Sequence, residues 1–378
     1  MKNMTKWAAM ALLTTAAGCS NSDNGGSDAG ITDSQVTPVS IDITPAEQQL
    51  VDAGNDFTFN LFRESRHLTM SQVLSPVSVT YALGMLNNGA AGQTQEQINT
   101  VLGFGQAGAA AINDYCYKML VRASKLDEKT RVMIANTIFV NNDMGCELLP
   151  DFQSKAKLFY QAVPEARSFS DGKTRNVINQ WASDHTEQMI KEVLSADEFS
   201  ANAVSYLLNA IYFKGIWAMK FDKAQTRDEV FNHIGLTNEV IYKPMMRMVA
   251  QFPYAENSLY QALQLPYGNG AYQMTVLLPR EKDNLDGIMA SLNATSWQQL
   301  QQQLDSTLVD LKLPRFEAST DLDLVPVMKK LGMSRAFDST QAEFPLFCNK
   351  DIYIGLMKQV AKIMVDEEGT EAAAVTVI

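Results

Sequence analysis

Three apolar runs of strand length constrain the fold of this chain more than any other feature. Residues 132–140, 206–213 and 274–279 consist mostly of Val, Ile, Leu, Met, Phe and Tyr. Such runs are typical of strands that are buried on both faces, because neither face needs polar side chains. Residues 308–313 alternate between apolar and polar side chains, which predicts a half-exposed strand.

Helical periodicity appears mainly in the first half of the folded region. Residues 47–64 carry apolar side chains at helical spacings. A second helix is predicted to start with Ser75 as its N-cap and Pro76 at its first helical position. Residues 176–193 predict a further helix. Helices that gather early and strands that gather late favour an α+β fold without internal repeats.

The first residues predict export. Lys2 and Lys6 precede the apolar run at 7–13, and small residues follow it. This is the pattern of a secretory signal peptide, here residues 1–18, because the run is too short for a permanent membrane-spanning helix.

The small residues directly before Cys19 resemble the bacterial lipoprotein pattern. The resemblance implies that Cys19 becomes the lipidated first residue of an exported chain, held on a bacterial membrane with its domain periplasmic, at the cell surface or extracellular. An ordinary cleaved signal with an incidental cysteine is the alternative. Residues 19–44 begin with a polar, Gly-rich stretch, which predicts a flexible linker before a folded domain at 45–378.

Charge and cysteine content exclude several classes of protein. The chain has 31 basic and 42 acidic residues and no prominent Lys/Arg run, so it lacks the electrostatic footprint of a nucleic-acid binder. Apart from Cys19, the cysteines are Cys116, Cys146 and Cys348. Their odd number and wide spacing predict neither a disulfide framework nor a metal site, and we expect no cofactor.

Catalytic motifs are missing from the sequence. His67, His185 and His233 are the only histidines, and none lies in His-Glu-x-x-His or beside a Gly-x-Ser-x-Gly turn. Residues 103–108 match Gly-x-Gly-x-x-Gly, but they follow a helical stretch rather than a strand. We therefore interpret them as a connection between helices and predict that the chain is not an enzyme.

The C-terminal stretch 365–378 is the most informative part of the chain. An acidic pair precedes Gly369, which is followed by small and β-branched residues. In a strand, one face would carry small side chains first, namely Thr370, Ala372, Ala374, Thr376 and Ile378. Such a segment can enter a sheet without a bulky side chain blocking it, and Gly369 would act as its hinge.

Residues 366–374 resemble the reactive-loop hinge of inhibitory serpins nearly residue for residue. Other serpin-like segments follow the order of that family, at 60–62, 74–78, 209–217, 243–246, 313–316 and 331–337. The resemblance covers 45–378. It implies the serpin fold, in which helices pack around a large central β-sheet with two further sheets.

The resemblance also implies a function, that of a suicide inhibitor of serine or cysteine endopeptidases. A protease cuts the exposed loop, the hinge enters the central sheet as a new strand, and the acylated enzyme is dragged across the molecule and distorted. Insertion of several residues supplies a driving force on the order of 10 kcal/mol. The target protease would be the partner of a monomeric inhibitor, and a non-inhibitory binding protein or an inactive fragment is the alternative.

Residue roles follow from the same resemblance. Glu367 and Trp217 correspond to the breach, where the sheet opens, and Ser75 and Asn209 to the shutter, where polar groups hold the central strands. Gln359 stands where many serpins have a shutter histidine. The predicted reactive-loop hinge consists of Glu367, Glu368, Gly369, Thr370, Glu371, Ala372, Ala373, Ala374, Val375 and Thr376.

The family continues beyond the hinge through the scissile residue and further strands, whereas this sequence ends at Ile378. We expect a fragment of a longer chain; a molecule already cut and a defective gene product are the alternatives. The residue that would enter the specificity pocket of the protease is not included, so the target is not predicted.

Overall fold

The computed structural model describes residues 2–3, 10–14, 40–66, 70–231, 241–281 and 284–378. Cys19 and most of the predicted linker lie outside these ranges. Among the described residues no helix combines the length and apolarity needed to cross a membrane. The helices are α1 (Pro45–Ser65), α2 (Pro76–Asn87), α3 (Gly92–Val101), α4 (Gly108–Arg122), α5 (Pro150–Tyr160), α6 (Lys173–Asp184), α7 (Leu285–Ser291), α8 (Ala294–Gln303) and α9 (Val325–Lys330).

The central sheet has six strands and is nearly all antiparallel. Only its edge pair, β3 and β4, is parallel. The strand order is β11 (Phe316–Asp323), β12 (Lys358–Val365), β13 (Gly369–Val377), β5 (Ser205–Ile216), β3 (Thr130–Asn141) and β4 (Val163–Arg167).

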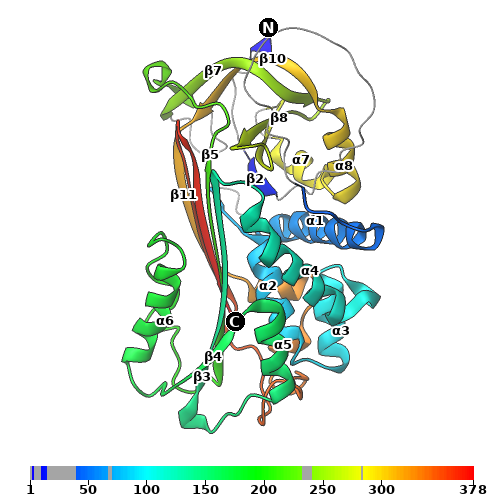
Figure 1. Ribbon diagram of the computed structural model, residues 1–378, viewed down its shortest axis with the longest axis vertical. Coiled ribbons are helices and arrows are strands. Elements are labelled where there is room, and N and C mark those ends of the chain that lie inside the picture. Colours follow the sequence, from blue (N-terminus) through cyan, green and yellow to red (C-terminus); the bar gives the residue numbers. More distant parts are fainter. Residues whose placement is uncertain (1, 4–9, 15–39, 67–69, 232–240, 282–283) are drawn as a thin grey trace.

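A second sheet lies at one end of the molecule, at the top of Figure 1. The sixteen-residue β7 pairs with β6 near its start and with β8 at its end, so the two further sheets of the prediction are joined into one seven-stranded sheet. Its order is β1 (Lys2–Asn3), β10 (Asp305–Pro314), β7 (Ile241–Glu256), β8 (Tyr260–Tyr267), β9 (Tyr272–Pro279) and β2 (Met10–Thr14), with β6 (Arg227–Phe231) paired to β7. Strand β2 belongs to the segment predicted as a signal peptide.

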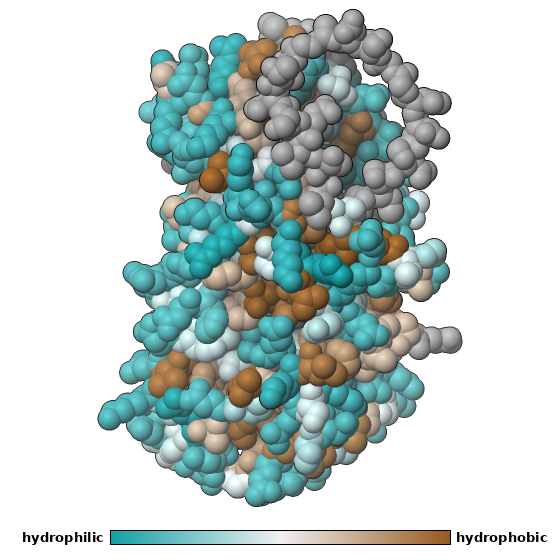
Figure 2. Space-filling view, in the orientation of Figure 1, coloured by the Kyte–Doolittle hydropathy of each residue, from teal (hydrophilic) through white to brown (hydrophobic). Residues whose placement is uncertain are grey.

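Helices cover both faces of the central sheet, which explains its apolar strands. Figure 1 shows α6 on one side and α2, α4 and α5 on the other. Helix α2 runs through the core, and every residue from Ser78 to Asn87 is buried. Figure 2 shows the surface of the molecule in the same view, where hydrophilic residues predominate and hydrophobic residues lie in separate patches.

Local sequence explains where the first two helices start. Thr44 and Glu47 form a capping box, in which the amide of Thr44 donates to the Glu47 carboxylate at 2.7 Å. Ser75 caps α2 by accepting from the amide of Ser78, as predicted. The 103–108 motif joins α3 to α4, so its interpretation as a helix connection is confirmed.

Two predictions of local structure need correction. The helix predicted at 176–193 is α6, and it ends at Asp184. Glu187 and Gln188 have φ values of 49° and 62°, a left-handed conformation that a helix cannot contain. Strand β10 was predicted to expose one of its faces. Leu308 on that face is exposed, but Asp310 on the same face is buried because its carboxylate pairs with Arg247 at 2.7 Å.

Candidate functional site

The predicted hinge forms the inner strand β13 of the central sheet. It lies antiparallel between β12 and β5, with Ala373 opposite Lys362 on one side and opposite Tyr212 on the other. Read alone, Ala372–Ala374 would suit a helix, but in the sheet both sides of this backbone gain hydrogen-bonding partners. Every residue from Gly369 to Ile378 is buried except the half-buried Glu371.

The two faces of β13 contact different layers of the molecule. Ala373, Val375 and Val377 pack in one apolar cluster with Ile178 and Ala182 of α6. On the other face, the hydroxyl of Thr376 lies 2.9 Å from that of Ser78 in α2. Ala372 and Ala374 follow Thr376 onto this second face by alternation, where small side chains leave room for the helices.

A tight turn at 366–369 connects β12 to β13. The carboxylate of Asp366 accepts from the amides of Glu368 at 2.8 Å and Gly369 at 3.1 Å. A Cβ atom on Gly369 would lie only 2.0 Å from the carbonyl oxygen of Gly215 in β5. The sequence suggested Gly369 as a hinge for its backbone freedom; the structure adds that the two strands approach too closely there for a side chain.

The predicted breach residues lie together at this turn. Trp217 stacks on Tyr267 with ring centroids 4.4 Å apart, and its indole N–H donates to the carbonyl of Asp366 at 2.8 Å. The hydroxyl of Tyr267 donates to that of the buried Thr370 at 2.6 Å. Burial raises the pKa of Tyr267 far above its ordinary value, so the phenol stays protonated and able to donate.

Acidic residues of the turn are held by several partners. Glu367 is buried and accepts from the hydroxyl of Thr226 at 2.7 Å. Glu368 is paired with Lys220 at 2.6 Å and Lys223, and these lysines lower its pKa. Further along β13, the carboxylate of Glu371 accepts from the hydroxyl of Tyr212 at 2.6 Å.

The predicted shutter residues lie near the other end of β13, where Gln359 and Ser75 contact each other and Asn209 has a different partner. Gln359 of β12 accepts from the amide of Ser75 at 2.8 Å and donates to the Ser75 carbonyl at 3.0 Å. The same amide group donates to Thr376 at 2.9 Å. Asn209 of β5 donates to Asn136 at 2.9 Å instead of joining this group. Its own Oδ1 is buried and accepts no hydrogen bond from any described residue.

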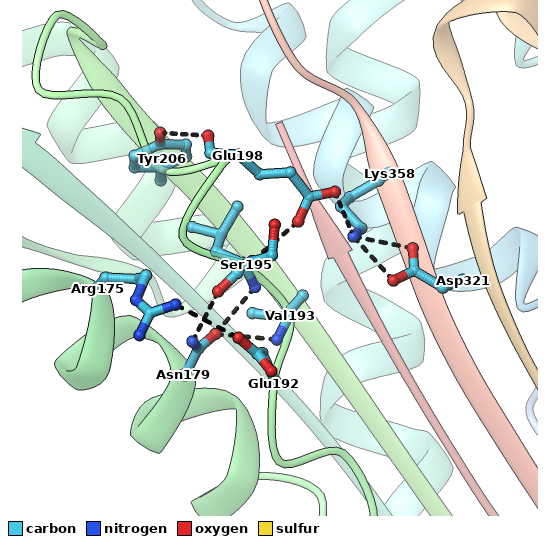
Figure 3. Close-up of polar contacts among 10 residues, drawn as sticks. Arg175, Asn179, Glu192, Val193, Ser195, Glu198, Tyr206, Asp321 and Lys358 are labelled. Atoms are coloured by element: carbon cyan, nitrogen blue, oxygen red, sulfur yellow. Dashed lines mark hydrogen bonds and ion pairs between the residues drawn. The ribbon is translucent and has the colours of Figure 1, made fainter.

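An ionic cluster of Lys358, Glu198 and Asp321 lies beside the end of β13; we call it the clasp (Figure 3). Lys358 of β12 is buried and lies beside Val377 of β13. Its ammonium group donates to Glu198, in the segment that follows α6, at 2.6 Å and to Asp321 of β11 at 2.9 Å.

The clasp shifts the pKa values of Glu198 and Lys358. Burial alone would raise the pKa of Glu198, but hydrogen bonds from Lys358 and from the amide of Ser195 bring it below its usual value. Burial alone would lower the pKa of Lys358, but its hydrogen bonds to Asp321 and Glu198 raise it overall. Both of these side chains are therefore charged at neutral pH.

Within the described part of the chain, no three His, Cys, Asp or Glu residues lie in a metal-binding arrangement. The rings of His185 and Trp181 stack with centroids 4.3 Å apart, and the Nδ1 of His185 shares a hydrogen bond with the carbonyl oxygen of Trp181. His67 and His233 lie outside the described residues.

Comparison with known proteins agrees with this geometry. A sequence model described as "Serpin (serine protease inhibitor)" matches residues 52–378. The chain belongs to the serpin family. The family takes its description from serine protease inhibition, and the α+β serpin fold predicted from the sequence is confirmed.

Serpins from distant animals are similar over most of their length. Serpin B3 of Homo sapiens is 32% identical over 353 residues, which cover 87% of this chain and 89% of that protein. A serine protease inhibitor of Cyanea capillata is 31% identical, with 80% of this chain and 81% of that protein covered.

Solved serpin structures have folds closely similar to that of this chain. "Cleaved Serpin 42Da" has a TM-score of 0.81 and 31% identity, with 88% of this chain and 89% of that chain covered. The thermophilic serpin Tengpin, solved in the latent state, has a TM-score of 0.81 and 26% identity, with 89% of both chains covered.

The structure brings together residues that sequence reasoning did not name as site residues. Ser78, Tyr267 and Asp366 each make a direct contact with β13 or its turn, and Lys358 of the clasp pairs with Val377 at the end of β13. The only available signal was Lys358, a charged residue at the start of an apolar strand. Its partners lie 160 and 37 positions away, so spacing could not identify them.

Proposed function

We propose that this serpin is a suicide inhibitor of serine or cysteine endopeptidases that acts as a monomer by cleavage and insertion of its reactive loop. The observation that carries the proposal is β13, in which small, buried residues fill a strand position between β12 and β5. A protease acylated at the end of that segment would be carried with it as the segment enters the sheet.

The energy available from insertion is sufficient for this task. Strand β13 has nine residues and is paired on both sides. Each hydrogen bond nets about 0.5 to 1.5 kcal/mol, and apolar burial adds to the sum, so insertion supplies on the order of 10 kcal/mol. This is comparable with the whole stability of a typical protease domain, roughly 5 to 15 kcal/mol.

The register of the sheet supports a state without β13. Gln359 and Asn209 stand at the same level, on either side of Thr376. If β13 left, β12 and β5 would pair directly and these two amides would become neighbours. Gln359 could then donate to the Asn209 oxygen that now lacks a partner, so the closed sheet would satisfy a group that the inserted state leaves unsatisfied.

Complex formation tests the proposal. The full-length protein is incubated with a panel of serine and cysteine proteases and analysed on denaturing gels. We expect an SDS-resistant complex with at least one protease. Thr370→Arg should be cleaved as a substrate without forming the complex, because burying an unpaired charge beside Tyr267 opposes insertion. A complex that persists in this variant would contradict the mechanism, and cleavage without a complex in the wild type would favour a non-inhibitory binding protein.

We also propose that the protein is exported and anchored to a bacterial membrane through lipidated Cys19. The support is the basic start, the apolar run and the small residues before Cys19. Metabolic labelling with a tritiated fatty acid tests it. The wild type should be labelled and sediment with membranes, whereas Cys19→Ser should lose the label. Equal labelling of both proteins would contradict the lipidation of Cys19.

A further inference from the structure

Two buried cysteines lie on segments that are far apart in the sequence but pair in the fold. Cys146 lies between β3 and α5, and Cys348 lies ahead of β12. Leu148 pairs with Cys348 in an isolated antiparallel bridge, and the amide of Leu149 donates to the carbonyl of Phe347 at 2.9 Å. Both cysteines are free in this structure, with exposed fractions of 8% and 4%.

The two segments are fixed against each other by further contacts. The amide of Asn349 donates to the carbonyl of Glu147 at 3.1 Å, and the amide of Glu147 donates to the side-chain oxygen of Asn349 at 3.0 Å. Next to them Phe347 packs against Phe152 of α5, with ring centroids 4.6 Å apart. The backbones that carry the two thiols are therefore held in place before any bond forms.

The thiol groups contact each other directly and differ in acidity. A hydrogen bond between the two thiol groups lowers the pKa of Cys348 to about 7, and Lys350 lowers it further against the effect of burial. The same contact raises the pKa of Cys146. Cys348 is therefore the thiol of the pair that more readily becomes the nucleophilic thiolate, as in reactive dithiols.

We propose that Cys146 and Cys348 form a reversible disulfide when the protein meets a small-molecule disulfide such as oxidised glutathione. The Cys348 thiolate attacks one sulfur of the reagent, forms a mixed disulfide and releases one glutathione thiolate. Cys146 then loses its proton and attacks the Cys348 sulfur, which forms the protein disulfide and releases the second glutathione. The two cysteines lose two electrons in total, and the reagent gains them.

The disulfide would connect two parts of the central sheet. Cys146 lies five residues after the end of β3, and Cys348 lies ten residues before the start of β12, while β13 and β5 lie between these two strands. The bond would therefore tie together the segment that leaves β3 and the segment that leads into β12, on opposite sides of β13. This proposal concerns the thiols themselves and does not depend on the inhibitory function.

Cys116 is a built-in control. It lies fully buried in α4, and burial raises its pKa to about 12, so it stays protonated. We expect it to remain unmodified by oxidised glutathione in the folded protein. Its behaviour separates a specific reaction of the paired thiols from general oxidation of an unfolding chain.

Differential alkylation with peptide mass spectrometry tests the proposal. The native protein is incubated with oxidised glutathione, unfolded, alkylated, digested without reduction and analysed. We expect a cross-linked peptide pair that contains Cys146 and Cys348, together with alkylated Cys116. Cys146→Ser should stop at the mixed disulfide and carry one glutathione on Cys348. The proposal is overturned if the wild type gives no cross-linked pair, or if Cys116 is modified as readily as Cys348.

Thermal unfolding gives a second readout. The bond closes a long loop, so oxidised wild type should melt at a higher temperature than reduced wild type, by about 5 °C or more. Cys116→Ser should keep this difference, and Cys146→Ser should abolish it. A difference that survives in Cys146→Ser would show that oxidation acts elsewhere and would contradict the assignment.

Discussion

At the residue scale, Gly369 shows how close packing selects a side chain. The sequence explains why a glycine suits a turn, but the decisive constraint is the carbonyl of Gly215 on a neighbouring strand. Ser75 caps α2 and Thr370 is buried, and both features have a local signal in the sequence. The orphaned oxygen of Asn209 leaves no such trace, since it depends on which strands are neighbours.

Gly369→Ala should destabilise the inserted strand. The new Cβ would meet the Gly215 carbonyl at 2.0 Å, so β5 and β13 must move apart. We expect a loss of about 1 to 3 kcal/mol in the free energy of unfolding, measured in urea. Gly172→Ala is the matched control, because a Cβ there would meet nothing within 4 Å. Equal stability of the two variants would show that the close approach is relieved at no cost.

Thr376→Val tests the polar contacts of the shutter. Valine keeps the shape of threonine but removes the hydroxyl that lies 2.9 Å from both Ser78 and Gln359. Leaving these buried groups unsatisfied should lower the free energy of unfolding by about 1 to 3 kcal/mol. Val375→Thr on the opposite face places a hydroxyl among apolar side chains and should also destabilise. A Thr376→Val chain as stable as the wild type would show that the hydroxyl contributes nothing.

At the element scale, the sequence predicted the main strands and the first two helices because their apolar patterns are long and regular. It failed beyond Asp184, where apolar spacing continued although Glu187 and Gln188 turn the backbone out of the helix. It also missed the clasp, because an ion pair between a strand and a distant loop has no sequence period. Pattern reasoning thus recovered the elements better than the contacts between them.

The clasp predicts that Glu198 and Asp321 have different roles. Glu198 lies in the segment between α6 and β5, whereas Asp321 lies on β11, which pairs directly with β12. Glu198→Gln should therefore speed amide hydrogen exchange in residues 194–204 and at the end of β13, by roughly fivefold for a loss of about 1 kcal/mol. Asp321→Asn should leave exchange in 194–204 nearly unchanged. Identical exchange in both variants would rule out the assigned role of Glu198.

The same cluster predicts a pH dependence of stability. The pKa of Glu198 is lower in the folded protein than its ordinary value of 4.5. Its contribution is therefore fully present above about pH 4.5 and is lost as the pH falls through the lower folded pKa. The unfolding free energy of the wild type should fall more steeply below pH 4.5 than that of Glu198→Gln. Parallel pH profiles for the two proteins would contradict this contribution.

At the scale of the whole molecule, the proposed function needs a sheet that exists in two states, with and without β13. The loss of the inserted strand exposes apolar side chains that now pack against α6, such as Val375 and Val377. The loop-inserted molecule should therefore be much the more stable of the two. Only a comparison between these states, and no single contact, distinguishes an inhibitory serpin from a static serpin-fold protein.

Cleavage of the reactive loop should raise the melting temperature. We expect an increase of about 10 °C or more when the full-length protein is nicked in this loop by a non-target protease, because insertion contributes on the order of 10 kcal/mol. Differential scanning calorimetry before and after nicking measures the change. The nicked Thr370→Arg variant should show little increase, since its charge cannot be buried beside Tyr267 without a large desolvation cost. A wild-type midpoint that stays unchanged after nicking means that the segment remains outside the sheet, and the chain is then a non-inhibitory member of its family.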